Sequence, residues 1–536
     1  MAKDVDMTRW ATSRRLQLAV TALSAVLAIS ACGDDSEASS PEGDFSGPPP
    51  ANSAVTVSEQ QIDDAIDRVP ELAEGIMSKT KIPGLAVAVV RGGEVAFAEG
   101  FGVREVGKDS KVDADTVFQI ASLSKSVGAT VIAEQVGKNV VEWETPVRQN
   151  LPSFTMSDRW ISDQVTIADM YTHRSGLPLH AGDILEDLGY GREDILSKLA
   201  QEPIEAANFR VHDAYTNFGI TAAAESVSVA AGTDWATLSQ NSLYGPLGMT
   251  NTSSRFADYL AHTDRAIPHT LVSDKYQPKF QRDPDAQSPA GGVSSTANDL
   301  AKWMNLVLAG GEHNGQPLVE KEPLVAAFTS EFAHGPGQDT SFRSGTSGYG
   351  VNVSTTSSGR VINSHSGAFN MGAATNYVMI PSLNVGIVAL SNAGPIGAVE
   401  ALTAEFVDLV QYGKITQDWV AGYAQLTAEP AEGELAGKQR PADAAPPGPL
   451  PRYAGTYGNP YWGEATVASM PDGNLQLTIG PDRVQYTLTP WSGDTWTFIP
   501  TGEMPNPGTV SQATFNGSTV VLEYFDDNGL GTFTKS

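Results

Sequence analysis

The chain has 536 residues, 41% hydrophobic and 18% charged, which is typical of a folded globular protein. This length allows a large core and at least one smaller module. The 34 basic and 62 acidic residues give a formal net charge of −28. A nucleic-acid-binding surface is basic, so this balance argues against nucleic acid as a partner.

The N-terminus carries an export pattern. Arg14-Arg15 precede an apolar stretch, Leu16–Ile29, which is too short and too early for an ordinary membrane span. Small residues then lead into Cys32, the only cysteine. This resembles a bacterial lipoprotein signal, so residues 1–32 are expected to end at a lipidated Cys32. We expect an exported protein, held by lipid in the bacterial cell envelope on its periplasmic or cell-surface face, without an internal disulfide.

Composition divides the rest of the chain. Residues 33–58 are rich in Ser, Pro, Gly, Asp and Glu, which predicts a disordered tether. A mixed region follows at 59–413. Residues 414–451 contain a helix end and then a proline-rich linker, and 452–536 form a separate C-terminal domain.

The mixed region begins and ends with strands. Apolar residues at helical spacing around 62–76 predict a first helix. Strands Gly84–Val90 and Val95–Phe101 follow, joined by an Arg91-Gly92-Gly93 turn. The middle is mostly helical. Further on, three strands and a helix are predicted at Arg360–Ser364, Ala373–Ile380, Val385–Ser391 and Ala398–Val410. This order predicts an α+β fold, in which one antiparallel sheet from distant segments is flanked by helices and carries a helical subdomain.

The C-terminal domain has a different periodicity. Short strand-like runs are separated by Gly, Pro, Asn and Asp, which predicts a small antiparallel β-barrel or sandwich. These runs are Ala465–Ala468, Leu475–Ile479, Val484–Leu488, Trp496–Ile499, Val510–Phe515 and Val520–Phe525.

Ser122 and Lys125 are the most informative pair. They stand three residues apart at the start of a proline-free apolar run, so both side chains lie on one helical face. The positive end of a helix disfavours a protonated lysine nearby. A neutral lysine can take the proton of the serine hydroxyl and make it a nucleophile.

The same spacing occurs a second time, at Ser78 and Lys81. Ser78 ends an amphipathic segment and Pro83 follows almost at once. Proline and the residue before it disfavour helix. We therefore expect this copy on a frayed, solvated helix end without catalytic chemistry.

Tyr215-Thr216-Asn217 stands just before an apolar helical start. A tyrosine is a poor base unless nearby cations stabilise its phenolate. Beside Lys125, Tyr215 would relay protons, and Asn217 would hydrogen-bond a substrate carbonyl or the lysine. The alternative is a helix cap and a packed tyrosine.

His365-Ser366-Gly367 follows the strand predicted to end at Ser364. A histidine, a hydroxyl and a glycine at a strand end can line a cleft, where the glycine lets a substrate backbone approach. The alternative is a turn with an incidental histidine.

Together, these three motifs resemble the serine β-lactamase and penicillin-binding-protein superfamily, with His-Ser-Gly in place of Lys-Thr-Gly. Flanking segments at 172–178, 245–249 and 289–292 resemble its class C-like branch, which also holds family VIII esterases, D-aminopeptidases and D,D-peptidases. The resemblance covers about residues 60–412. The C-terminal domain, with Tyr453-Ala454-Gly455-Thr456-Tyr457, resembles a lipocalin-like domain.

The resemblance implies roles for these residues. Ser122 would form an acyl-enzyme on a small ester or peptide, while Lys125 and Tyr215 handle protons. Asn217, His365, Ser366 and Gly367 would bind substrate. The backbone N–H groups of Ser122 and Ala368 would form the oxyanion hole. Water would release the product, so neither metal nor cofactor is needed.

The expected charge of His365 favours some substrate classes over others. Lysine at this position helps many β-lactamases hold the carboxylate of the drug, whereas histidine is largely neutral near pH 7. This favours an esterase or peptidase. A β-lactamase or penicillin-binding D,D-carboxypeptidase is the alternative among enzymes. An acylated sensor or binding lipoprotein is the alternative of another class. The natural substrate and the oligomeric state stay open.

Overall fold

The computed structural model describes residues 43, 48, 51–334, 340–341, 344–428 and 430–536. Cys32 and the predicted signal sequence lie outside these residues. Among the described residues, no helix combines the length and the apolar character that a membrane span requires.

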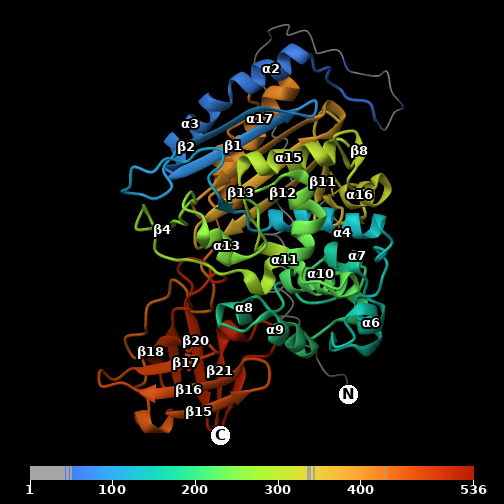
Figure 1. Cartoon of the computed structure of the whole chain (residues 1–536). Coiled ribbons are helices and arrows are strands. Elements are labelled where there is room, and N and C mark those ends of the chain that lie inside the picture. The colour runs from blue at the N-terminus through green and yellow to red at the C-terminus, as the bar shows by residue number, and fades with distance from the viewer. Residues whose placement is uncertain (1–42, 44–47, 49–50, 335–339, 342–343, 429) are drawn as a thin grey trace.

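The centre of the larger domain is an eight-stranded antiparallel sheet with the order β2-β1-β14-β13-β12-β11-β10-β9 (Figure 1). The predicted pairing of distant segments is confirmed, because β1 lies directly beside β14. The strands are β1 (Gly84–Arg91), β2 (Glu94–Gly102), β9 (Phe332–Ala333), β10 (Thr346–Ser347), β11 (Asn352–Thr355), β12 (Val361–Phe369), β13 (Ala373–Ile380) and β14 (Val385–Ser391).

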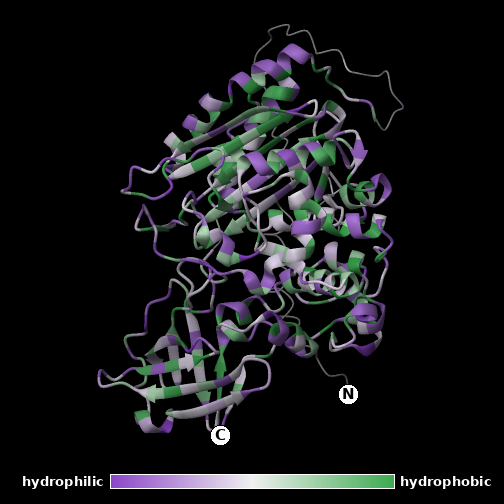
Figure 2. Ribbon diagram, in the orientation of Figure 1, coloured by the Kyte–Doolittle hydropathy of each residue, from purple (hydrophilic) through white to green (hydrophobic). Residues whose placement is uncertain are grey.

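Helices cover both faces of this sheet. Helices α2 (Glu59–Asp67), α3 (Val69–Thr80) and α17 (Ala398–Tyr412) cover one face, and α4 (Leu123–Gly137) and α15 (Ala297–Leu308) cover the other. Strand β1 shows why. Its odd-numbered apolar residues join the core under α17, and its even-numbered ones join the core under α15, as alternation along a strand requires. Figure 2 shows hydrophobic residues along the central strands.

A helical subdomain lies between the two halves of the sheet sequence, as predicted. Its helices are α5 (Val147–Asn150), α6 (Arg159–Gln164), α7 (Ile167–Tyr171), α8 (Asp183–Asp187), α9 (Arg192–Lys198), α10 (Asn217–Ala231), α11 (Trp235–Ser239), α12 (Gly245–Leu247), α13 (Phe256–Ala261) and α14 (Ser288–Gly291). Helices α16 (Lys321–Phe328) and α18 (Trp419–Leu426) lie outside it in the sequence. Three two-stranded pairs complete the domain: β3 (Phe118–Gln119) with β6 (Ser294–Ser295), β4 (Thr270–Val272) with β5 (Lys275–Gln277), and β7 (Glu312–His313) with β8 (Gln316–Pro317).

The C-terminal domain is a closed antiparallel barrel, which confirms the predicted class. It lies beside α8 and α9 in Figure 1. Its eight strands are β15 (Gly455–Asn459), β16 (Gly463–Ser469), β17 (Leu475–Ile479), β18 (Val484–Ser492), β19 (Thr495–Phe498), β20 (Ser511–Asn516), β21 (Thr519–Leu522) and β22 (Thr532–Lys535). Buried aromatic side chains, among them Trp496, Phe515 and Phe533, contribute to its core.

The predicted limits of four segments differ from those in the structure. Strand β12 continues through Phe369 because it stays paired with β13 beyond Ser364. The first helix is two helices broken at Arg68, where Pro70 opens α3. The run Val520–Phe525 leaves the strand after Leu522. Ser53 and Val55, expected in the tether, are buried against the turn between β11 and β12.

Candidate active site

Ser122 stands at the N-cap of α4, on a strained backbone. The preceding residue, Ala121, has φ +47°, a conformation that is costly for any residue with a Cβ. Two hydrogen bonds hold it there. Ser124 Oγ donates to Ala121 O at 2.6 Å, and Thr375 Oγ1 donates to Ile120 O at 2.8 Å. Contacts from α4 and β13 therefore hold the strained backbone directly before Ser122.

Lys125 is fully buried and reaches three oxygen atoms. Its Nζ lies 2.9 Å from Ser122 Oγ, 2.7 Å from Asn217 Oδ1 and 2.9 Å from the carbonyl oxygen of Ala290. Burial lowers the pKa of Lys125 to about 7, because an ammonium group loses its hydration there. A substantial fraction of the side chain is therefore neutral near pH 7. The predicted neutral lysine is thus found, but its cause is burial and not the helix end on which the sequence argument relied.

Tyr215 completes the contact with the serine. Its hydroxyl lies 2.6 Å from Ser122 Oγ, and Lys125 Nζ lies 4.5 Å from the centre of its ring. Burial raises the pKa of Tyr215 above its usual value, so the phenol is protonated. Its ring packs against His173, with 4.5 Å between the ring centres, which shows how the expected cleft-shaping loop at 172–178 contributes.

These contacts assign the protons. Asn217 Oδ1 and Ala290 O are acceptors only, so a neutral Lys125 amine donates its two N–H groups to them. Its lone pair then faces Ser122 Oγ. The protonated Tyr215 hydroxyl donates to the same Oγ. Ser122 Oγ therefore donates to the lysine and accepts from the tyrosine.

Asp183 orients Asn217, and sequence reasoning missed it. Asn217 Nδ2 donates to Asp183 Oδ2 at 2.9 Å, and His180 Nδ1 lies 2.8 Å from the same oxygen. The amide of Asn217 is thereby fixed with its oxygen toward Lys125. Of the two partners expected for Asn217, the structure shows the lysine, and the substrate carbonyl stays a prediction. Asp183 is the first residue of α8 and belongs to none of the sequence motifs described above.

Neighbouring residues of β12 face opposite ways. His365 is paired with Tyr377, whose hydroxyl donates to Ser126 Oγ of α4. Ser366 is paired with Asn376, which donates to Ser366 Oγ and accepts from Thr403 of α17. His365 therefore lies on the side of Lys125, whereas Ser366 is engaged on the α17 side of the sheet.

His365 is neutral. Burial and the nearby Lys125 lower the pKa of His365 to about 4, and its Nδ1 lies 2.6 Å from Ser366 O. The ring therefore contributes no positive charge to the site at pH 7. This agrees with the expectation drawn from its ordinary pKa.

Gly367 lets β12 approach Ser122 closely. A Cβ at this position would collide with Ile120 O and Thr375 Oγ1 and would lie 2.9 Å from Ser122 N. The close neighbour of this glycine is therefore the chain around Ser122. The approach of a substrate backbone, expected from the sequence, stays a prediction. Strand β11 pairs with β12 only as far as Ser364, so β11 leaves the edge from His365 to Ala368 uncovered.

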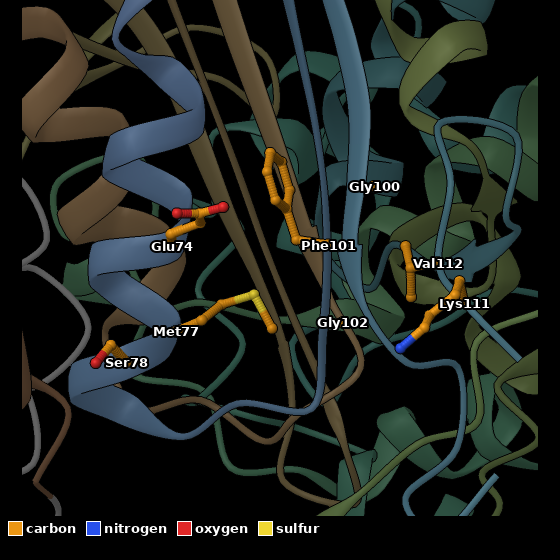
Figure 3. Close-up of a pocket in the computed structure, with 8 residues that line it drawn as sticks. All are labelled: Glu74, Met77, Ser78, Gly100, Phe101, Gly102, Lys111 and Val112. Atoms are coloured by element: carbon orange, nitrogen blue, oxygen red, sulfur yellow. The ribbon is translucent and has the colours of Figure 1, made fainter. Parts of the chain in front are cut away.

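Ser78 and Lys81 lie elsewhere and are both exposed. Ser78 lines a cavity of about 570 Å³ beside β2, with Glu74, Phe101 and Lys111 among the other lining residues (Figure 3). Lys81 is not among the residues that line it. The expected exposure of this copy is confirmed, but the helix end is capped at Lys81 rather than frayed. The absence of catalytic chemistry there stays a prediction.

Among the described residues, no group of three or more His, Cys, Asp or Glu side chains is placed to hold a metal ion. The groups around Ser122 are a lysine, a tyrosine, an amide and a histidine, and they are suited to moving protons.

Sequence comparisons agree with this geometry. The β-lactamase family model matches residues 69–412, and a domain of unknown function, DUF3471, matches residues 439–517. A protein named unguisins hydrolase ungD' from Aspergillus campestris is 25% identical over 79% of this chain and 82% of its own length. The D-alanyl-D-alanine-carboxypeptidase/endopeptidase AmpH of Escherichia coli K12 is 22% identical over 65% of this chain and 89% of its own.

Solved structures share the fold. The octameric penicillin-binding protein homologue from Pyrococcus abyssi matches 88% of this chain and all of its own, with a TM-score of 0.56 and 18% identity. A class C β-lactamase from Rhodobacter sphaeroides matches 64% of this chain and 98% of its own, with a TM-score of 0.52 and 20% identity. With the family model matching more than half of its length, this chain belongs to the β-lactamase family and is a serine hydrolase.

Proposed function

We propose that the protein hydrolyses an ester or amide bond through an acyl-enzyme on Ser122. The neutral Lys125 amine takes the hydroxyl proton as Ser122 Oγ bonds to the carbonyl carbon. Tyr215, protonated and hydrogen-bonded to Oγ, passes a proton to the leaving group and is reprotonated from Lys125. The observation that carries this proposal is the buried amine 2.9 Å from the serine oxygen.

The second half of the reaction uses the same groups. Water attacks the acyl carbon, gives a proton to the free Lys125–Tyr215 pair, and Ser122 leaves with a proton returned to Oγ. The negative oxygen formed in both steps requires donors. The N–H groups of Ser122 and Ala368 are the proposed donors, because β12 approaches the backbone of Ser122 at Gly367.

The proposed substrate is an ester, peptide or related amide rather than a β-lactam drug. A neutral His365 gives no charge to hold a drug's carboxylate. A second candidate is D,D-carboxypeptidase activity, which the match over 89% of AmpH favours. An acylated sensor remains the candidate of another class, since a sensor keeps the nucleophile and loses only deacylation.

Substrate assays separate these three functions. We expect hydrolysis of p-nitrophenyl esters or D-aminoacyl amides without stable labelling by fluorescent penicillin. Labelling that is lost quickly in a chase would indicate a β-lactamase. A label that persists would indicate a sensor or a penicillin-binding protein, and release of D-alanine from a D-Ala-D-Ala peptide would identify the carboxypeptidase.

We further propose that the enzyme works at the cell envelope, anchored through lipid on Cys32. The order of apolar segment, small residues and cysteine supports this. Replacing Cys32 by serine should move the protein from the membrane fraction to the soluble fraction. Continued membrane attachment of Cys32→Ser would refute the lipid anchor while leaving the hydrolase untouched.

A further inference from the structure

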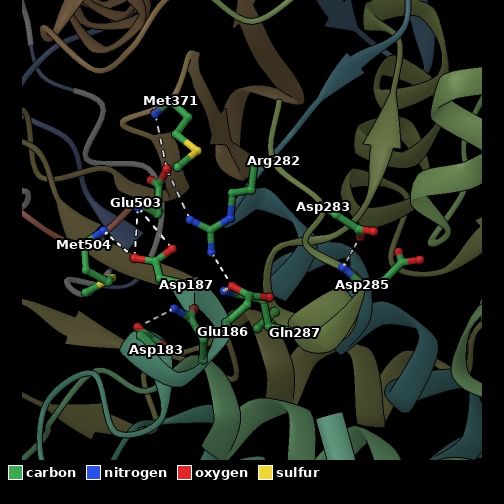
Figure 4. Close-up of polar contacts among 12 residues, drawn as sticks. Asp183, Glu186, Asp187, Arg282, Asp283, Asp285, Gln287, Met371, Glu503 and Met504 are labelled. Atoms are coloured by element: carbon green, nitrogen blue, oxygen red, sulfur yellow. Dashed lines mark hydrogen bonds and ion pairs between the residues drawn. The ribbon is translucent and has the colours of Figure 1, made fainter. Parts of the chain in front are cut away.

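A loop of the barrel reaches the hydrolase domain through Glu503. This loop joins β19 to β20. The Glu503 carboxylate accepts the N–H groups of Asn370 at 2.6 Å and Met371 at 3.2 Å. It also pairs with Arg282 at 3.2 Å. Asn370 Nδ2 donates to the carbonyl oxygen of Glu503 at 2.9 Å. One barrel residue therefore hydrogen-bonds three groups of the other domain and forms an ion pair with a fourth. Figure 4 shows its contacts with Met371 and Arg282.

The contact is reciprocal. Asp187, the last residue of α8, accepts the N–H groups of Glu503 at 2.9 Å and Met504 at 3.1 Å. A side chain at Gly502, which has φ +135°, would collide with this carboxylate. Each domain thus presents a carboxylate to backbone N–H groups of the other: Glu503 is buried and Asp187 is half-buried. Such charge-assisted bonds are strong and directional. We call the pair Asp187 and Glu503, with their N–H partners, the clasp.

The clasp holds segments that carry the active site. Asn370 and Met371 directly follow Phe369, the last residue of β12, and the open edge from His365 to Ala368 comes just before it. The Arg282 guanidinium lies 4.4 Å above the Phe369 ring. The carbonyl oxygen of Arg282 accepts from Gln119 Nε2 at 3.0 Å, and Gln119 leads into Ser122.

The other side of the clasp also leads to the site. Helix α8 ends at Asp187 and begins at Asp183, which orients Asn217. Glu186 of the same helix pairs with Arg282 at 2.5 Å. Arg282 is therefore shared between a carboxylate of the hydrolase domain and one of the barrel, and both carboxylates are nearly buried.

We propose that Glu503 is a positioning residue for hydrolysis, through which the barrel fixes the β12 side of the catalytic cleft. Without the Glu503 carboxylate, two backbone N–H groups lose their acceptor and Arg282 loses one of its two partners. The end of β12 is then free to shift away from Ser122. The inference rests on the proposed function, because it assigns the Ala368 N–H to the transition-state oxygen.

The expected effect is on turnover rather than on substrate affinity. A small displacement of an oxyanion donor weakens an interaction made mainly in the transition state. Glu503→Ala should therefore lower kcat by about 10- to 100-fold and change KM by less than about 3-fold. Glu503→Gln keeps an oxygen for the N–H groups but loses the charge facing Arg282, and should recover part of this loss.

A matched control tests whether any loosening of the interface has this effect. Asn528 of the barrel donates to Glu202 of the hydrolase domain at 2.9 Å, and neither residue contacts β12. Asn528→Ala removes one interdomain bond and should leave kcat within about 2-fold of the unsubstituted protein. Ester turnover and thermal unfolding would be measured for all three variants in the full chain.

The kcat values of the three variants show whether Glu503 positions β12. A kcat loss in Glu503→Ala, with partial recovery in Glu503→Gln and normal turnover in Asn528→Ala, supports it. Normal kcat in Glu503→Ala, or an equal loss in Asn528→Ala, overturns it. If Glu503→Ala does not fold, Glu503→Gln decides by the same comparison with Asn528→Ala. Activity that survives Ser122→Ala would instead refute the proposed function, so the two failures are distinguishable.

Discussion

The chain contains two serines followed three residues later by lysine, and the two copies have opposite surroundings. Ser122 and Lys125 begin α4, where Lys125 has no exposed surface. Ser78 and Lys81 end α3, where both are exposed and Lys81 is a left-handed C-cap with φ 62°. The spacing is therefore common to both copies, and burial is what separates them.

The Ser-x-x-Lys spacing alone does not bury the lysine or give it hydrogen-bond partners. Lys125 loses hydration and gains acceptors from Asn217 and Ala290, which belong to two other segments. Tyr215 donates to the serine from a third position on the chain. A solvated lysine such as Lys81 has none of these constraints. Tertiary packing places one serine against a buried lysine and a tyrosine and leaves the other on the surface.

Removing each serine should give the largest contrast. Ser122→Ala should lower kcat/KM for an ester by at least about 10⁴-fold, because it removes the hydroxyl on which the proposed acyl-enzyme forms. Ser78→Ala should stay within about 2-fold of the unsubstituted protein, as a surface substitution does. Steady-state assays on both variants measure the contrast, and similar losses in the two would break the comparison.

The two lysines should differ nearly as much. Lys125→Met should lower kcat by about 10²- to 10⁴-fold, the usual range for loss of a general base. Its melting temperature should not fall, because a buried amine is replaced by an apolar chain of similar length. Lys81→Met should change neither quantity. Inactivity with a large drop in melting temperature would point to a structural role for Lys125 instead.

The pH dependence sharpens the assignment to Lys125. Its pKa is lowered to about 7, so the neutral amine prevails above pH 7 and the ammonium form prevails below it. The kcat/KM of the free enzyme should fall about tenfold per pH unit below pH 7. His365, with a pKa of about 4, stays neutral throughout this range. An acidic limb centred near pH 4 would contradict the lysine assignment.

A smaller effect is expected from Asp183. Its negative charge raises the pKa of Lys125 against the effect of burial, so Asp183→Asn should lower that pKa. The acidic limb should move to lower pH, by up to about one pH unit. A limb that moves to higher pH would contradict this electrostatic role. Rate profiles of this variant and the unsubstituted enzyme, measured side by side, provide the test.

The strongest local patterns could be predicted from the sequence. The apolar runs of β13 and β14 are buried on both faces, so their hydrophobicity alone marks them. Strand β12 was predicted too short because its last residues, from His365 to Ala368, have little strand preference. Its pairing with β13 overrides that preference. The two additional barrel strands, β15 and β22, are short and polar in part, and become evident only when the barrel closes.

The active site was predictable where motifs carry it. Ser122, Lys125, Tyr215 and Asn217 lie together. Asp183 and the Ala290 carbonyl were missed, because an isolated aspartate and a backbone oxygen carry no sequence signal of their partners. Glu503 is more than 100 residues from Asn370 and Met371, which it contacts. Only the folded chain brings these groups together.

Mass spectrometry of a trapped acyl-enzyme would identify the residue that carries the acyl group. The protein would be mixed with a slowly deacylating activated ester, quenched in acid and digested. We expect one acyl group per chain, on the peptide that contains Ser122 and not on the peptide that contains Ser78. An adduct on Ser78, or on a residue other than Ser122 in an active preparation, would contradict it.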